Sequence, residues 1–217
     1  FSVYAGRGFI MKHTAKMGHL LDQRPVTLEL NVYQQSYGKS FYDSLYKMPR
    51  IGMALLYIRM DQEKPLGDMW AGVVYYSKNL LKTEKLLWDL RLGIGPGYVK
   101  RTFDLHQNYK NNLISSQLNY CLYARSGFRV RLNPGFYMNV GLALTHFSNG
   151  SYKVPNLGIN VPALYTGFEI GGKKADNLKA VFIPQKKVYN LYLFGGIGFK
   201  EVMPVDGPRF FAGTFSS

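Results

Sequence analysis

Residues 136–148 read FYMNVGLALTHFS, and their alternation decides the class of the fold. Large apolar side chains take every second position, at Phe136, Met138, Val140, Leu142 and Leu144. Successive side chains of a β-strand point to opposite faces, so this period of two predicts a strand with one apolar face. His146 and Ser148 continue the apolar series and therefore belong to the same face.

The same alternation recurs along the chain, and no segment shows a convincing helical period with caps. The strand candidates are Ser2–Ile10, Val26–Tyr33, Ile51–Met60, Met69–Ser77, Trp88–Gly95, Ile114–Arg125, Phe136–Ser148, Ala163–Gly171, Asn190–Lys200 and Pro208–Phe215. The 17 tyrosines and 14 phenylalanines agree with strands, because aromatic residues are favoured on pleated surfaces. No window approaches the roughly 18 consecutive apolar residues of a transmembrane helix. The sequence therefore predicts an all-β chain.

Two architectures share this alternation. A soluble β-sandwich or lipocalin-type barrel turns its apolar face inward, whereas an outer-membrane barrel turns it toward lipid. Here the faces opposite the apolar stripes carry Gly, Ser, Asn, Gln and scattered charges, which suits a narrow polar lumen. Tyrosines near the strand ends favour an interfacial girdle, at Tyr33, Tyr75, Tyr76, Tyr98 and Tyr165. We predict an antiparallel transmembrane β-barrel of at least eight strands, with a soluble lipid-binding barrel as the alternative.

The loop lengths predict which ends of the strands lie together. Residues 131–135, RLNPG, form a predicted tight turn of the kind found on the periplasmic side. The polar loops then fall on the outer side, at residues 11–25, 61–67, 99–113 and 149–162. The segments 36–48 and Lys173–Lys187 are long for periplasmic turns.

The formal net charge of +14 does not by itself choose a partner. Nucleic-acid binding has little support, because no compact module with interleaved aromatic residues accompanies the charge. Basic loop residues could instead contact phosphates of a membrane lipid, at Lys12, Lys16, Arg24, Lys100, Arg101, Lys110 and Lys153. His13, His19 and His106 fall in predicted loops without Cys, Asp or Glu at metal-ligand spacing, so we expect solvated side chains and neither a metal nor a cofactor.

His146 and Ser148 carry the candidate chemistry. Residues two apart on a strand point the same way and lie within side-chain reach. A histidine beside a serine hydroxyl can act as its general base and can later protonate the leaving group. At the end of a lipid-facing stripe, such a pair would meet a membrane lipid. The alternative is a histidine and a serine that only anchor the strand end at the interface.

The longer stretch 146–160, HFSNGSYKVPNLGIN, resembles the signature of the lipid A 3-O-deacylase (PagL) family. That signature reads His-x-Ser-Asn, then Pro-Asn-x-Gly a few residues later, then a polar residue two positions further. The resemblance is specific over these residues, extends more weakly from Tyr109 through Gly171, and is nearest to the branch described as acyloxyacyl hydrolases. It implies an outer-membrane barrel whose active site faces the outer leaflet, and hydrolysis of the ester-linked 3-hydroxyacyl chain of lipid A in lipopolysaccharide.

The resemblance also implies roles for single residues. Ser148 would be the nucleophile and His146 the base, and Asn160 stands where characterised members have the glutamate of the triad. The oxyanion-stabilising and substrate-binding positions would be Asn149, Gly150, Ser151 and Asn156. An asparagine can orient an imidazole through its carbonyl, but it stabilises an imidazolium less than a carboxylate does. Glu169 lies on the opposite face of its strand and cannot easily substitute.

We therefore expect a carboxylic ester hydrolase in the outer membrane of a Gram-negative bacterium. Residues 1–217 would form a single β-barrel domain, with a PagL-like core at 1–171 and additional strands at 172–217, in a chain that continues beyond its last residue. The alternative is a non-catalytic accessory barrel with protein partners in a larger outer-membrane assembly. The substitution at Asn160 and the extra strands motivate this second hypothesis.

Overall fold

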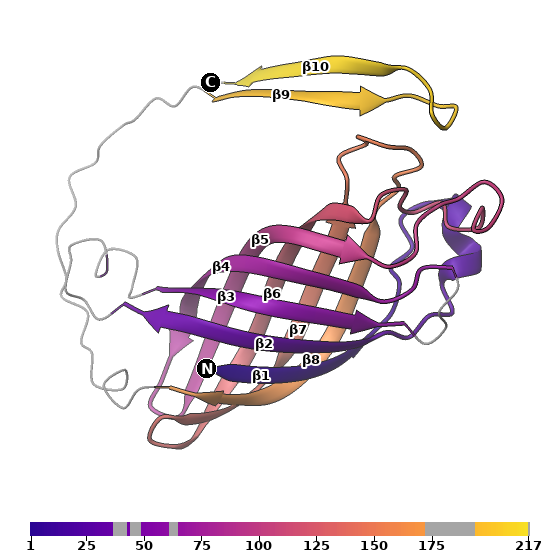
Figure 1. Ribbon diagram of the computed structural model, residues 1–217. Coiled ribbons are helices and arrows are strands. Elements are labelled where there is room, and N and C mark those ends of the chain that lie inside the picture. Colours follow the sequence, from indigo (N-terminus) through magenta and orange to yellow (C-terminus); the bar gives the residue numbers. More distant parts are fainter. Residues whose placement is uncertain (37–42, 44–48, 61–64, 172–193, 217) are drawn as a thin grey trace.

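Eight antiparallel strands close into a barrel, and a separate two-stranded sheet follows them (Figure 1). The computed structural model describes residues 1–36, 43, 49–60, 65–171 and 194–216. The barrel strands are β1 (Ser2–Gly8), β2 (Val26–Gln35), β3 (Arg50–Arg59), β4 (Met69–Lys82), β5 (Leu86–Val99), β6 (Leu118–Asn133), β7 (Phe136–Ser148) and β8 (Ile159–Ile170). Each strand pairs with the next in the sequence, and pairing of β1 with β8 completes the ring. The separate sheet consists of β9 (Phe194–Glu201) and β10 (Arg209–Ser216).

The two faces of the wall exclude the soluble alternative. Along β5, Leu92 and Ile94 leave 56% and 57% of their surface exposed outside, whereas Asp89 and Arg91 are 2% and 0% exposed inside. The other barrel strands repeat this arrangement of apolar residues outside and polar residues inside, for example at Leu30 and Asn31 of β2. A soluble barrel would carry the reverse distribution. The wall is therefore that of a transmembrane β-barrel.

Charged residues fill the part of the lumen away from the long loops. The Glu169 carboxylate accepts hydrogen bonds from Arg129 at 2.8 Å, Arg50 at 3.0 Å and Tyr33 at 3.0 Å. A second centre forms around Glu29, which binds Arg91 at 2.9 Å. All of these arginines are buried, so each charge depends on its partners inside the wall.

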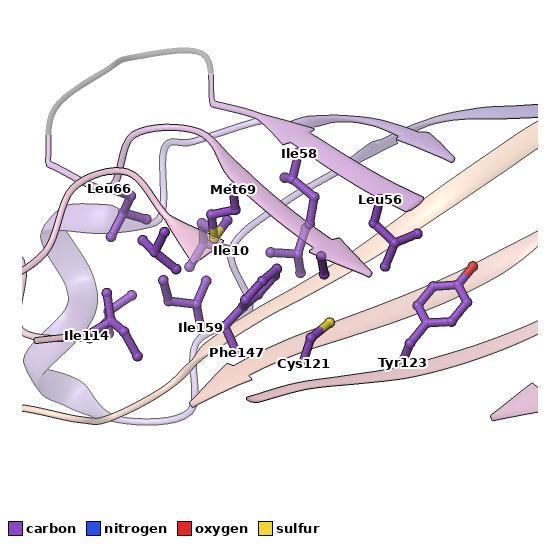
Figure 2. Packing of buried hydrophobic residues seen from close by; sticks show 14 of the residues in the cluster. Ile10, Leu56, Ile58, Leu66, Met69, Ile114, Cys121, Tyr123, Phe147 and Ile159 are labelled. Carbon is purple, nitrogen blue, oxygen red and sulfur yellow. The ribbon is translucent and has the colours of Figure 1, made fainter. Parts of the chain in front are cut away.

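The lumen becomes apolar toward the long loops, which differs from the polar lumen that the sequence predicts. Figure 2 shows a cluster in which Ile10, Leu66 and Ile114 from three loops pack on Phe147 and Ile159 from the barrel wall. A short 3-10 helix, η1 (Ala15–Leu20), adds Met17 and Leu20 to this loop-end core. The loops therefore close the barrel by apolar packing.

The predicted tyrosine girdle is only partly correct. Tyr76 and Tyr98 face outward, but Tyr75 and Tyr165 are buried inside, and Tyr33 bonds Glu169 there. Strand parity explains the error, because the neighbours Tyr75 and Tyr76 must point to opposite faces. An outer aromatic row does exist at the loop end of β3–β5, where the ring centroids of Trp70 lie 5.2 Å from Tyr57 and 5.9 Å from Tyr98.

The strand boundaries shift by several residues from the predicted ones. β6 begins at Leu118 rather than Ile114, and Ile114 is fully buried in the loop that precedes it. The predicted tight turn is present between β6 and β7, and the long loops lie together at the other end of the barrel (Figure 1). The segment Lys173–Lys187 and most of 36–48 lie outside the described residues.

Replacement of Glu169 by alanine should destabilise the barrel by about 3–5 kcal/mol, because it leaves buried Arg129 and Arg50 without their shared carboxylate. Equilibrium unfolding of the refolded barrel in urea measures this. The matched control is Glu84→Ala in the exposed β4–β5 turn, with an expected change within about 0.5 kcal/mol. Equal effects of the two substitutions would contradict the role of the buried network.

Candidate active site

His146 and Ser148 lie on the outer wall at the loop end of β7, as their parity predicts. Both side chains are half-buried, and Phe147 between them is fully buried in the loop-end core. A β-strand rises about 3.4 Å per residue, so the Cβ atoms of His146 and Ser148 stand about 7 Å apart on one face. The buried Phe147 therefore fixes the end of the strand that carries His146 and Ser148.

Asn160 lies directly opposite His146 across the β7–β8 pair. Its Oδ1 is 2.7 Å from Nδ1 of the imidazole. The amide oxygen can only accept, so the contact assigns the ring proton to Nδ1. Nε2 of a neutral imidazole is then unprotonated, which is the state that a general base requires. The structure thus brings together the predicted His146 and Asn160.

The Ser148 hydroxyl oxygen receives two hydrogen bonds from the following loop. Nδ2 of Asn156 donates to Oγ at 2.9 Å, and the backbone N–H of Gly150 donates at 3.2 Å. A hydroxyl offers two acceptor positions and one proton. Because both acceptor positions are engaged, the hydroxyl proton of Ser148 is the atom still available to a base. The two donors also favour a negative charge on Oγ.

A tight turn aims the Gly150 N–H. Residues 149–152 form it, with Gly150 and Ser151 at φ of 66° and 64° and the N–H of Tyr152 bonded to the carbonyl of Asn149 at 3.2 Å. Positive φ at both central residues is the type I′ arrangement, and only glycine takes it without strain. Nδ2 of Asn149 donates to the carbonyl of Lys153 in the same loop at 2.9 Å and to Oγ of Ser116 in the β5–β6 loop at 2.8 Å. The amide nitrogen of Asn149 is therefore engaged by these two loops.

Gly158 closes the loop against the histidine ring. Its φ is +80°, and a Cβ added there would lie 2.9 Å from Cε1 of His146. Its N–H donates to the carbonyl of Leu113 at 2.9 Å, which ties this loop to the loop between β5 and β6. A glycine at this position therefore allows close approach of the backbone to the imidazole.

The β9–β10 hairpin lies above the barrel in Figure 1 and is hydrogen-bonded to the same loop. The Glu201 carboxylate is 1% exposed and accepts the N–H of Val154 at 2.7 Å, while the N–H of Glu201 donates to the carbonyl of Ser151 at 2.9 Å. The guanidinium of Arg209 also stacks over the Tyr152 ring at 4.7 Å. The hairpin thus adds three contacts to the loop that positions the Ser148 donors.

His13 is a neighbour of the site, although the sequence predicts it to be a solvated loop residue. Its Nδ1 lies 3.2 Å from Nδ2 of Asn160, and its Nε2 lies 2.8 Å from the carbonyl oxygen of Leu157. The side chain is exposed but hydrogen-bonded at both ring nitrogens. Its separation of 147 residues from Asn160 explains why no local pattern could reveal the contact.

Among the residues that the structure describes, no group of three or more His, Cys, Asp or Glu side chains could hold a metal ion. No helix in the described part of the chain is long and apolar enough to cross a membrane.

Comparison with known families decides the assignment. The sequence model for lipid A 3-O-deacylase (PagL) matches residues 27–169, which is well over half of the chain. The chain belongs to the PagL family. The match contains the site residues of β7, β8 and the loop between them, and it excludes His13 and the β9–β10 hairpin. Membership of this family, together with the lipid-facing barrel wall, makes the chain an outer-membrane protein.

Individual relatives add little to the PagL assignment. No curated protein matches the chain significantly. Among solved structures, the Yersinia pestis outer membrane protein Ail in a phospholipid bilayer nanodisc is similar over 78% of this chain and 99% of its own, with 13% sequence identity. The TM-score of this match is 0.35.

Replacement of Gly158 by alanine should leave the barrel folded and reduce kcat/KM of ester hydrolysis on the order of 100-fold, because the new methyl group displaces the imidazole. The left-handed backbone adds a strain of about 1–2 kcal/mol. Gly67→Ala is the matched control, since Gly67 has φ +65° but contacts Arg101 rather than the site. A comparable loss of activity in both variants would show that strain alone is responsible.

Proposed function

We propose that this PagL-family chain is an outer-membrane carboxylic ester hydrolase that removes the ester-linked 3-hydroxyacyl chain from lipid A of lipopolysaccharide. The observation that carries the proposal is the outward-facing group of Ser148, His146 and Asn160, with the Asn160 carbonyl 2.7 Å from the imidazole. Its position at the end of the apolar wall supports a substrate that stays in the outer leaflet, near the headgroups.

In the first half of the reaction, Nε2 of His146 takes the proton from Ser148 as Oγ attacks the ester carbonyl carbon. The developing oxyanion sits on that carbon, next to Oγ. We assign the stabilisation of this oxyanion to the two groups that now contact Oγ, Asn156 Nδ2 and the Gly150 N–H, together with the Ser151 N–H that follows in the same turn. The C–O bond to the sugar then breaks, and the sugar oxygen receives the proton from His146.

In the second half, water attacks the acyl group on Ser148. His146 accepts a proton from the water and returns it to Oγ as the acyl–enzyme bond breaks. The products are the lipid A 3-hydroxyl group and a free 3-hydroxy fatty acid. Asn160 holds the imidazole in the tautomer that both halves need. Asn149 contributes by shaping the turn, because its amide nitrogen is held by the Lys153 carbonyl and the Ser116 hydroxyl.

A basic groove beside the site supports a phosphorylated lipid as the substrate. Arg7, Lys12 and Arg24 line it together with the apolar Phe9 and other residues of the β1–β2 connection. The groove borders the site, because the N–H of Met11, the residue before Lys12, donates to the carbonyl of Asn160 at 3.0 Å. Cationic side chains beside an apolar wall suit a lipid phosphate at the headgroup boundary.

Substitution of Ser148 by alanine should reduce loss of the hydroxyacyl chain by several orders of magnitude, because it removes the nucleophile. Mass spectrometry of lipid A from cells expressing each variant measures this. Ser126→Ala is the control, since Ser126 also lies on the outer wall of the barrel, where it accepts a hydrogen bond from Trp88. Undiminished deacylation by the folded Ser148→Ala barrel would exclude the mechanism.

Substitution of Asn160 by aspartate should raise kcat on the order of tenfold or more, since a carboxylate stabilises the imidazolium better than an amide. Steady-state kinetics with purified lipopolysaccharide in detergent measures the change. An unchanged or lower kcat in a correctly folded variant would mean that Asn160 does not act on the imidazolium in the transition state.

A non-catalytic accessory barrel is the second candidate. The amide at position 160 favours it, and so does the hairpin, whose Ile197, Phe199 and Phe215 are 83%, 62% and 74% exposed. Fixed partners that co-purify with the barrel, together with lipid A that is the same with and without the gene, would support this candidate over the hydrolase.

A further inference from the structure

We propose that His13 is a positioning residue of the active site, which holds the Asn160 amide with its oxygen toward His146. This inference rests on the proposed hydrolase function and adds a residue from outside the stretch 27–169 that matches the PagL family. His13 lies in the connection between β1 and β2, and Asn160 lies in β8, which pairs with β1. The backbone bond from the Met11 N–H to the Asn160 carbonyl, at 3.0 Å, fixes the approach of the two residues.

The hydrogen bonds form a directed chain. His146 Nδ1 donates to Asn160 Oδ1 at 2.7 Å, Asn160 Nδ2 donates to His13 Nδ1 at 3.2 Å, and His13 Nε2 donates to the Leu157 carbonyl at 2.8 Å. The last acceptor is a backbone carbonyl, which cannot donate. Because the Leu157 carbonyl can only accept, it fixes the proton of His13 on Nε2 and thereby the direction of the other hydrogen bonds in the series.

One other tautomer of His13 competes with this chain. With its proton on Nδ1, His13 would donate to the Met11 carbonyl at 3.3 Å. That tautomer would lose the 2.8 Å bond to the Leu157 carbonyl and would set an N–H against the Asn160 amide nitrogen. The tautomer protonated at Nε2 makes two complementary contacts, and it is the one that the geometry favours.

His13 matters because Asn160 is an amide. A carboxylate presents an acceptor oxygen whichever way it rotates, whereas an amide turned by about 180° would present N–H groups to the imidazole. With its proton on Nε2, His13 offers Nδ1 as an acceptor to the Asn160 amide nitrogen and so disfavours that turn. It also strengthens Asn160 as an acceptor, because hydrogen bonds in a directed chain polarise one another when the imidazolium forms. His13 thus compensates in part for the missing carboxylate.

Two substitutions separate the two contacts of His13. His13→Asn places an amide oxygen where Nδ1 stands and keeps the acceptor for Asn160, but it cannot reach Leu157. His13→Gln places an amide nitrogen near the position of Nε2 and keeps the donor for Leu157. We expect kcat to fall about tenfold in His13→Gln with little change in KM, and to stay near the wild-type value in His13→Asn. The opposite order would assign His13 to anchoring the loop and overturn the proposal.

The same pair in an Asn160→Asp background provides the matched control. A carboxylate needs no orientation, so the difference between His13→Asn and His13→Gln should disappear there. If His13→Gln lowered kcat equally with and without the Asn160→Asp substitution, His13 would act through the fold and not through the Asn160 amide, which would overturn the proposal.

A measurement that does not depend on activity keeps this proposal distinct from the proposed function. Nitrogen-15 spectra of the histidine rings in the refolded barrel should place the proton of His13 on Nε2 and the proton of His146 on Nδ1. An inactive wild-type protein with these tautomers would reject the hydrolase and keep the contact. A His13 ring protonated at Nδ1 would reject the positioning role, whatever the activity.

Discussion

The structure depends on the alternation of side chains through a single closed wall, which register shifts interrupt only at Asn79/Leu81 and Arg131/Asn133 among the described strands. Every barrel residue faces either lipid or lumen, and pairing of β1 with β8 leaves the ring without an open edge. At the end of β7, the inner and the outer face of the strand both have a role. Phe147 enters the loop-end core, and its neighbours His146 and Ser148 are thereby held on the outside. The packing that closes the barrel and the geometry of the candidate site are thus two results of one constraint.

The two halves of the lumen have different roles. The arginines and carboxylates around Glu169 and Glu29 satisfy one another within a sealed interior, where an unpaired charge would be costly. The apolar half beneath the long loops supplies contacts that do not depend on direction, and these contacts hold the loops against the barrel. The hydrogen bonds to Ser148 and His146 require this apolar packing, since donors on an unsupported loop would not keep distances near 3 Å.

Much of the fold could be predicted because period-two alternation is local. The strands and the outward face of His146 and Ser148 follow from it, and the loop lengths predict that the long loops lie together at one end. The tyrosines are where the prediction was wrong: nearness to a strand end suggested the girdle, but parity sends Tyr75 and Tyr165 inward. The contacts of His13 and Glu201 with the site could not be predicted, because they join loops that only the closed barrel brings together. The pairing of His146 with Asn160 likewise depends on the register between β7 and β8, and no single strand encodes that register.

A hydrolytic group on the outer wall of a barrel meets its substrate in two dimensions. In the proposed hydrolase, the lipid would arrive by lateral diffusion, so the quantity that governs saturation would be its mole fraction in the leaflet rather than its concentration in the surrounding water. Diluting the leaflet with an inert lipid would slow turnover even with the total amount of substrate held constant. On the same proposal, the released acyl chain would pass directly into the hydrocarbon beside the site, and product departure would require no crossing of the aqueous phase.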